Sequence, residues 1–418
     1  MKAKITSFLL WSQKYTKADM LYIFKNGSWV MFGQGVNSVL SLVLIVAFAN
    51  LLPKETYGTY KYILSLAGLL NIFTLTGMNN AVARSVATGL EGILKPAVKY
   101  QLVWNSIMFF ALTLLGSYYL FHGDQTLAIS FFILGVFTPM TLAFNTYGAF
   151  LEGKKYFGTA NILSTLSTLS YATGILIALL CSDSVTLLIG VYATATFLPS
   201  FVFYRYVVHK FKQTTTTAIN DTLRYGRELT YLRIIDPIVS NIDKILLAHF
   251  WGPAQLATYT LALAIPNRAT LFMKSWVAIG FPKFSEKTFS GINLVFWRRV
   301  IQGMIIGLIT TTLYILVSPF IFHYVLPQYI EGIFYSQLLA ISFIFAIPNR
   351  YISLLLTSQR LSKVLYKRTF IHSTTSISLY ILGGIWGGIL GLVVAHILID
   401  LMGLTINIIL WRSASKSS

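Results

Sequence analysis

Charged side chains recur along one stretch of the chain that is otherwise apolar enough to lie inside a membrane. Arg233, Asp236, Ser240, Asp243 and Lys244 recur at intervals of three, four or seven. On a helix with about 3.6 residues per turn, this spacing puts them along one side. A charge at the bilayer centre costs about 2.5 to 3.5 kcal/mol on insertion scales. The stripe is therefore predicted to line a wet cavity, although the Arg233 and Asp236 spacing also fits a simple i, i+3 ion pair.

The pentapeptide Ala-Ile-Pro-Asn-Arg occurs twice, at residues 264–268 and 346–350. Each proline is predicted to break its helix, and Pro237 is predicted to kink the helix that carries the charged stripe. At about 1.5 Å per residue, Arg268 and Arg350 both fall in the inner half of the bilayer. Because a guanidinium forks onto phosphate with two parallel hydrogen bonds, the pair predicts an anion clamp. Arg350 is also close enough to the boundary to snorkel to water.

Three further ionisable residues lie within apolar runs. His396 and Asp400 are one helical turn apart, a spacing that fits a site for taking and releasing a proton. The same spacing fits a neutral, hydrogen-bonded fixture between helices. Lys61 lies in the first turns of its own apolar run, where a lysine is expected to snorkel outward.

No catalytic constellation accompanies these residues. The 418 residues include 13 acids, no glycine motif for phosphate binding, and a single cysteine, Cys181. One cysteine excludes an intramolecular disulfide and a cysteine-rich metal site. The sequence therefore predicts a protein that is not an enzyme and that has no metal or cofactor.

The composition places these residues in an all-α polytopic membrane protein. Hydrophobic residues make up 56% of the chain and charged residues 11%, against about 25% charged in soluble proteins. The formal net charge of +19 comes from short clusters between apolar runs, which excludes the contiguous basic face of a nucleic-acid binder.

A membrane-spanning helix needs about 20 apolar residues, and twelve such runs are present. Their approximate limits are 28–52, 57–79, 98–120, 127–150, 157–181, 185–208, 229–251, 254–281, 296–321, 332–356, 365–384 and 389–411. Lys and Arg concentrate in alternate connections, and the opposite connections hold only Lys54. Because basic residues favour the cytoplasmic side, both termini are predicted to be cytoplasmic.

An even number of spans fits two parallel six-helix bundles related by a pseudo-two-fold axis along the membrane normal. A weak repeat supports this, since residues 49–66 align with residues 248–265. The predicted organisation is a cytoplasmic lead-in, an N-terminal bundle, a cytoplasmic linker, a C-terminal bundle and a cytoplasmic tail, at 1–27, 28–208, 209–228, 229–411 and 412–418.

Several short motifs carry a resemblance to a known family. They are Leu51-Leu52-Pro53, Tyr57-Gly58-Thr59-Tyr60, the run 77–84 (GMNNAVAR), Asn241-Ile242-Asp243-Lys244 and the Gly252-Pro253 turn. In these motifs and in topology the chain resembles the polysaccharide (O-antigen type) flippases. Those proteins belong to the multidrug, oligosaccharidyl-lipid and polysaccharide exporter superfamily.

The resemblance implies a V-shaped pair of bundles in the bacterial cytoplasmic (inner) membrane, with a central cavity that opens to either side in turn. The implied substrate is an undecaprenyl-pyrophosphate-linked oligosaccharide, flipped from the inner to the outer leaflet for surface polysaccharide assembly. Arg233, Lys244, Arg268 and Arg350 are the residues expected to hold the pyrophosphate. Implied partners are membrane lipids and, as open alternatives, a proton or sodium counter-ion and other polysaccharide-assembly proteins. The chain has fewer predicted spans than the lipid II flippase branch, which counts against a peptidoglycan substrate.

The alternative is a cation-coupled drug or small-molecule exporter of the same superfamily, which would need acids to dominate the cavity. The candidates for ion coupling are Asp236, Asp243, His396 and Asp400. The membrane potential is the rival energy source, because moving one charge through 100 mV is worth about 2.3 kcal/mol.

Overall fold

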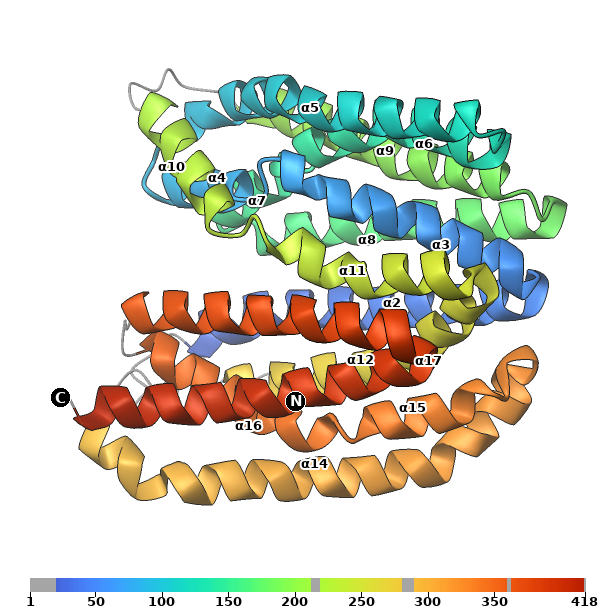
Figure 1. Cartoon of the computed structure of the whole chain (residues 1–418). Coiled ribbons are helices and arrows are strands. Elements are labelled where there is room, and N and C mark those ends of the chain that lie inside the picture. The colour runs from blue at the N-terminus through green and yellow to red at the C-terminus, as the bar shows by residue number, and fades with distance from the viewer. Residues whose placement is uncertain (1–19, 212–218, 280–288, 359–361, 417–418) are drawn as a thin grey trace, which may run out of the picture. The chain divides into compact units, whose positions relative to one another are not determined.

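The computed structural model describes residues 20–211, 219–279, 289–358 and 362–416, and every regular element in these ranges is a helix (Figure 1). In chain order the first helices are α2 (Met20–Leu51), α3 (Lys54–Leu69), η1 (Leu70–Phe73), α4 (Met78–Ala87), η2 (Glu91–Ile93), α5 (Leu94–Phe121), α6 (Gln125–Phe144), α7 (Thr146–Gly153), α8 (Phe157–Cys181), α9 (Val185–Lys210) and α10 (Ile219–Tyr231). The remaining helices are α11 (Asp236–Trp251), α12 (Pro253–Ile279), α14 (Phe289–Val325), η3 (Pro327–Tyr329), α15 (Gly332–Ala340), α16 (Phe343–Ser358) and α17 (Ser362–Lys416). Residues 1–19 of the predicted lead-in, 212–218 of the predicted linker and 280–281 of the eighth predicted span lie outside the described residues.

The chain divides into two compact units. Unit 1 comprises residues 1–47 and 66–237, and unit 2 comprises residues 48–65 and 238–418. Residues 48–65, predicted in the N-terminal bundle, belong to unit 2, whereas residues 219–237, predicted in the linker and the C-terminal bundle, belong to unit 1. The two six-helix bundles and their pseudo-two-fold relation stay predictions.

In unit 1, α6 packs between α5 and α9, and α8 packs along α9 (Figure 1). The two faces of α5 show why these helices suit a membrane. Val103, Phe110 and Leu114 recur at helical spacing and are 67%, 66% and 74% exposed, whereas Met108 and Leu112 on the other side are fully buried. An apolar face of this size has no favourable contact with water, so we assign it to lipid.

Part of the predicted linker is an ordered helix of unit 1. Helix α10 packs against α4, where the Thr230 hydroxyl accepts a hydrogen bond from the backbone N–H of Gly77 at 3.0 Å. The hydroxyls of Ser85 and Thr222 are 2.7 Å apart and buried between the same two helices. A Cβ atom on Gly77 would lie 2.6 Å from Thr230 N, so this close approach requires glycine.

In unit 2, α16 packs against α12, α14 and α17 (Figure 1). Contacts of Gly58 and Lys54 help to join the hairpin of residues 48–65 to this unit. Gly58 lies against the backbone of Pro253, where a Cβ atom would be 1.8 Å from the carbonyl oxygen. Lys54 Nζ lies 2.7 Å from Glu331 Oε1.

The structure confirms a polytopic helical membrane protein but not twelve spans. By length and composition, the described residues contain 8 helices able to cross a membrane, or 9 if α3 through α4, bent by 57°, counts as one span. Helix α11, with 16 residues, is too short to count. Helix α17 counts once, although it is two helices that meet at Gly388, where φ is 54°. This left-handed backbone favours glycine and matches the boundary between the last two predicted spans.

Candidate functional site

The predicted charged stripe does not lie on one continuous helix. Helix α10 ends at Tyr231, a turn covers residues 232–235, and α11 begins at Asp236. The helix break is at the turn, so the prediction of a helix from residue 229 through Arg233 is wrong. Pro237 lies in the first turn of α11, where its missing N–H leaves no intrahelical bond unmade. Arg233 is exposed in this turn.

Asp243 lies at the centre of the part of the stripe that α11 does carry. Its side chain is buried, with 4% of the residue exposed. The Tyr259 hydroxyl on α12 donates a hydrogen bond to Oδ2 at 3.0 Å. Lys244 Nζ lies 3.3 Å from Oδ1 and donates to the backbone oxygen of Ser240 at 2.7 Å. These contacts compensate the cost of burying the carboxylate.

A second lysine, Lys61 on α3, joins this site. The charges of Lys244 on α11 and Arg268 on α12 are both near enough to act on its ammonium group. The Lys61 ammonium is 5.3 Å from the ring of Tyr57 and 5.8 Å from that of Tyr60. With Asp243 as the contacting acid, this group carries net positive charge. We call Lys61, Lys244 and Arg268 the cationic cluster.

Sequence reasoning missed Lys61. A lone lysine in the first turns of an apolar run cannot be told from one that snorkels to water. The sequence feature that indicates a role inside the protein is the pair of tyrosines before it, since the YGTYK run places two aromatic rings next to the charge.

The structure puts the two arginines of the repeated pentapeptide in different groups. Arg268 belongs to the cationic cluster, whereas the charge of Arg350 on α16 acts on Arg368 of α17. Arg368 Nη1 donates to the Ser353 hydroxyl at 3.0 Å. Arg350 Nε is buried without a hydrogen-bond partner in the described part of the chain.

Neither proline of the repeated pentapeptide breaks its helix. Helix α12 continues through Pro266, so the predicted break there is wrong. A turn at Ile341 and Ser342 separates α15 from α16, but it precedes the second pentapeptide. Helix α16 continues through Pro348, so the predicted break there is wrong as well.

His396 and Asp400 belong to a polar layer inside unit 2. His396 Nδ1 lies 3.1 Å from the hydroxyl of the buried Tyr380, and this contact joins the two halves of α17. The charges of Asp243 and Asp400 both act on Tyr380. One of the four candidate ion-coupling residues thus contacts this tyrosine and two more act on it by their charge, whereas Asp236 is exposed at the start of α11. This layer has the groups that a proton relay needs.

The described residues do not form a candidate metal site. Among the residues that the structure describes, no three His, Cys, Asp or Glu side chains gather as a metal site requires.

Comparison with known proteins identifies a family. A family model described as "Polysaccharide biosynthesis protein" matches residues 23–288, well over half of the chain. The chain is also similar to a Shigella flexneri protein named "Putative O-antigen transporter", with 21% identity over 280 residues, which are 63% of this chain and 67% of that protein.

Two solved structures share the fold. The lipid II flippase MurJ in an inward closed conformation superposes with a TM-score of 0.71 and 15% identity, covering 91% of this chain and 86% of that one. An inward-facing multidrug resistance MATE family transporter of the MOP superfamily gives a TM-score of 0.65 and 14% identity, covering 91% and 95%. These likenesses show the fold, and the family model shows that the chain belongs to the polysaccharide biosynthesis protein family.

Proposed function

We propose that this protein flips an undecaprenyl-pyrophosphate-linked oligosaccharide from the cytoplasmic to the outer leaflet of the bacterial inner membrane, by alternating access, for surface polysaccharide assembly. The observation that carries the proposal is the cationic cluster. Three helices bring Lys61, Lys244 and Arg268 together inside a membrane protein, where each charge is costly unless it serves a ligand or pairs with an acid.

A pyrophosphate group supplies the negative charge that the cluster lacks. A sugar headgroup with two phosphates cannot cross hydrocarbon unaided, because its charge and hydroxyls would lose their hydration. Lysine and arginine replace that hydration with charge-assisted hydrogen bonds, which are about twice as strong as neutral ones. Arg233, exposed in the turn before α11, and Arg350, in its separate group with Arg368, stay predicted contacts of the pyrophosphate.

The proposal is tested by a flipping assay in proteoliposomes, with fluorescent undecaprenyl pyrophosphate carrying one N-acetylglucosamine as the probe. Arg268→Ala should lower the initial rate by roughly ten- to hundredfold, the worth of a hydrogen bond to a charged group. Arg298→Ala, which removes an exposed arginine at the start of α14, is the matched control and should keep the parent rate. Equal rates for the parent and Arg268→Ala would remove the cluster from the mechanism.

One observation favours the alternative, a cation-coupled drug or small-molecule exporter. Asp243 is a buried acid linked to Tyr259, next to the Tyr380 and His396 pair, and such a layer can exchange a proton for a cationic substrate. Mass spectrometry of lipids that co-purify with the protein separates the two functions. An isoprenoid pyrophosphate sugar supports the flippase, whereas its absence, with binding of organic cations that Asp243→Asn abolishes, supports the exporter.

The layer also bears on the energy source under the leading proposal. If Asp243, His396 and Asp400 carry a proton inward, flipping should follow an imposed pH gradient. If the membrane potential suffices, an imposed potential alone should drive it, because the substrate is an anion leaving a negative interior.

A further inference from the structure

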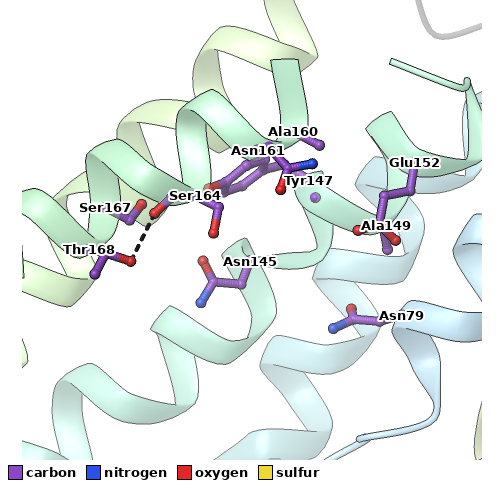
Figure 2. A pocket seen from close by; sticks show the side chains of 11 residues that line it. Asn79, Asn145, Tyr147, Ala149, Glu152, Ala160, Asn161, Ser164, Ser167 and Thr168 are labelled. Atoms are coloured by element: carbon purple, nitrogen blue, oxygen red, sulfur yellow. Dashed lines mark hydrogen bonds between the residues drawn. The ribbon is translucent and has the colours of Figure 1, made fainter. Parts of the chain in front are cut away.

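Unit 1 contains a pocket that none of the charged residues above helps to form. It has a volume of about 410 Å³ and lies where α4, the α6 to α7 junction and the start of α8 meet (Figure 2). Its polar lining is made mainly of amides and hydroxyls, from Asn79, Asn145, Asn161, Ser164, Ser167 and Thr168. Among the described residues no lysine or arginine lines it. Apart from the Glu152 carboxylate, the described lining therefore offers neutral hydrogen-bonding groups, in contrast to the cationic cluster.

The amide of Asn79 is held in one orientation by a chain of buried hydrogen bonds. Gln101 Nε2 donates to the Thr146 hydroxyl at 2.7 Å, and that hydroxyl donates to Asn79 Oδ1 at 3.0 Å. Gln101 is 3% exposed and Thr146 is fully buried. Because the oxygen of Asn79 is occupied, its NH₂ group is the part left to donate to a ligand.

In Asn161 on α8 the NH₂ group, rather than the oxygen, is the part already hydrogen-bonded. Its Nδ2 donates to the backbone oxygen of Phe157 at 2.9 Å, and a backbone oxygen can only accept. The side-chain oxygen of Asn161 is therefore left to accept. The Ser200 hydroxyl donates a hydrogen bond to Asn145 Oδ1 at 2.8 Å, which leaves the NH₂ group of Asn145 to donate to a ligand. Figure 2 shows the side chains of Asn79, Asn145 and Asn161 around a common space.

This arrangement fits sugar hydroxyls, each of which both donates and accepts. The Tyr147 ring adds an apolar surface. Its hydroxyl lies beside the hydroxyl of Ser167, whose oxygen is buried and makes no hydrogen bond of good geometry in the described part of the chain. Glu152 supplies a carboxylate that accepts from hydroxyls and repels phosphate. A volume of about 410 Å³ is within the range of pockets for small ligands.

We propose that this pocket of unit 1 binds a neutral sugar of the transported headgroup. The source of that sugar rests on the proposed function above. In the predicted topology the adjacent Lys154 and Lys155 are cytoplasmic, so the pocket lies near the side from which the substrate is loaded.

The test is an array of neutral and acidic oligosaccharides, free of lipid, probed with the full-length protein in nanodiscs. The protein should retain a subset of neutral glycans. Asn79→Ala and Asn161→Ala should each weaken retention by about three- to tenfold, the net worth of one hydrogen bond. Asn80→Ala, which removes the exposed neighbouring amide on α4, should leave retention unchanged.

The outcomes separate this inference from the proposed function. Glycan retention that survives Arg268→Ala but not Asn79→Ala supports the pocket whatever lipid the protein carries. Retention of no neutral glycan, or equal retention by the parent and the Asn79→Ala and Asn161→Ala double variant, overturns the pocket. Either result leaves the flipping assay with Arg268→Ala to decide the proposed function by itself. Thermal melting of each variant shows whether it is folded, and Asn79→Ser, which keeps a small polar side chain, replaces any that is not.

Discussion

The two units hold their interior polar groups in different ways. Unit 1 buries neutral groups, such as Gln101 and Thr146, and uses them to orient amides around a pocket. Unit 2 gathers Lys61, Lys244 and Arg268 around one buried carboxylate. Neutral amides give directional selectivity at low cost, whereas charges give strong but less selective attraction to an anion. The difference fits a substrate with a variable sugar part and a constant pyrophosphate part.

Reversing charge in unit 2 is the strongest way to break this comparison. Arg268→Glu should reduce flipping of the pyrophosphate probe by at least about hundredfold, because it removes a favourable charge and adds a repulsive one. Arg268→Lys should flip the probe at an intermediate rate, since lysine keeps the positive charge but cannot make the two parallel hydrogen bonds of a guanidinium. Initial rates in proteoliposomes measure both.

The control is Arg298→Glu, an equal charge reversal at an exposed position. If it slows flipping as much as Arg268→Glu does, net charge rather than the cluster controls transport.

The hairpin that brings Lys61 to unit 2 is the next target. Gly58→Ala would place a methyl group 1.8 Å from the Pro253 oxygen, so the hairpin must shift. We expect a loss of about 1 to 3 kcal/mol in the free energy of unfolding, as for other overpacked sites. Gly190→Ala in unit 1, with no atom within 4 Å of the added carbon, should be neutral or slightly stabilising. Thermal melting in detergent compares them, and equal melting temperatures would mean that the close approach at Gly58 is absent in solution.

Salt should distinguish the two units without any mutation. The Debye length falls from about 10 Å at 0.1 M to about 3 Å at 1 M. Binding of undecaprenyl pyrophosphate should weaken several-fold over this range, whereas retention of a neutral glycan should change little. Parallel titrations at both salt concentrations measure this, and identical salt dependence would contradict the division between charged and neutral sites.

The smallest expected effect is the pH dependence of the Lys54 to Glu331 ion pair. Hydrogen bonds from Lys54 at 2.7 Å and from Thr258 at 3.0 Å hold the pKa of the Glu331 carboxyl below its usual value. A lowered folded-state pKa adds stability above the usual value of about 4.3, and this is lost as pH falls through the folded value. Because the pair is largely exposed, its contribution should be under about 1 kcal/mol.

Melting of the parent and Glu331→Gln from neutral to acidic pH measures this term. The parent should be the more stable at neutral pH, and the two should converge in acid. A gap that stays constant with pH would mean that the ion pair does not fasten the hairpin.

The charged residues of unit 2 were largely predictable from the sequence, because Asp243, Lys244 and Arg268 are conspicuous in apolar runs. The boundary between the last two spans was predictable too, since the glycines near Gly388 interrupt an apolar stretch. The turn at 232–235 was not, because the residues around it have ordinary helical spacing. The pocket left no periodic signal, since its amides come from α4, the α6 to α7 junction and α8, and any one of them alone resembles an ordinary packing residue.

The most direct test of the central claim is native mass spectrometry of the protein with sugar-free undecaprenyl pyrophosphate. The parent should bind one lipid, and the Lys61→Gln and Arg268→Gln double variant should bind it at least tenfold more weakly, because two of the three clustered charges are gone. Equal binding by the parent and the double variant would contradict the claim that the cationic cluster holds the pyrophosphate.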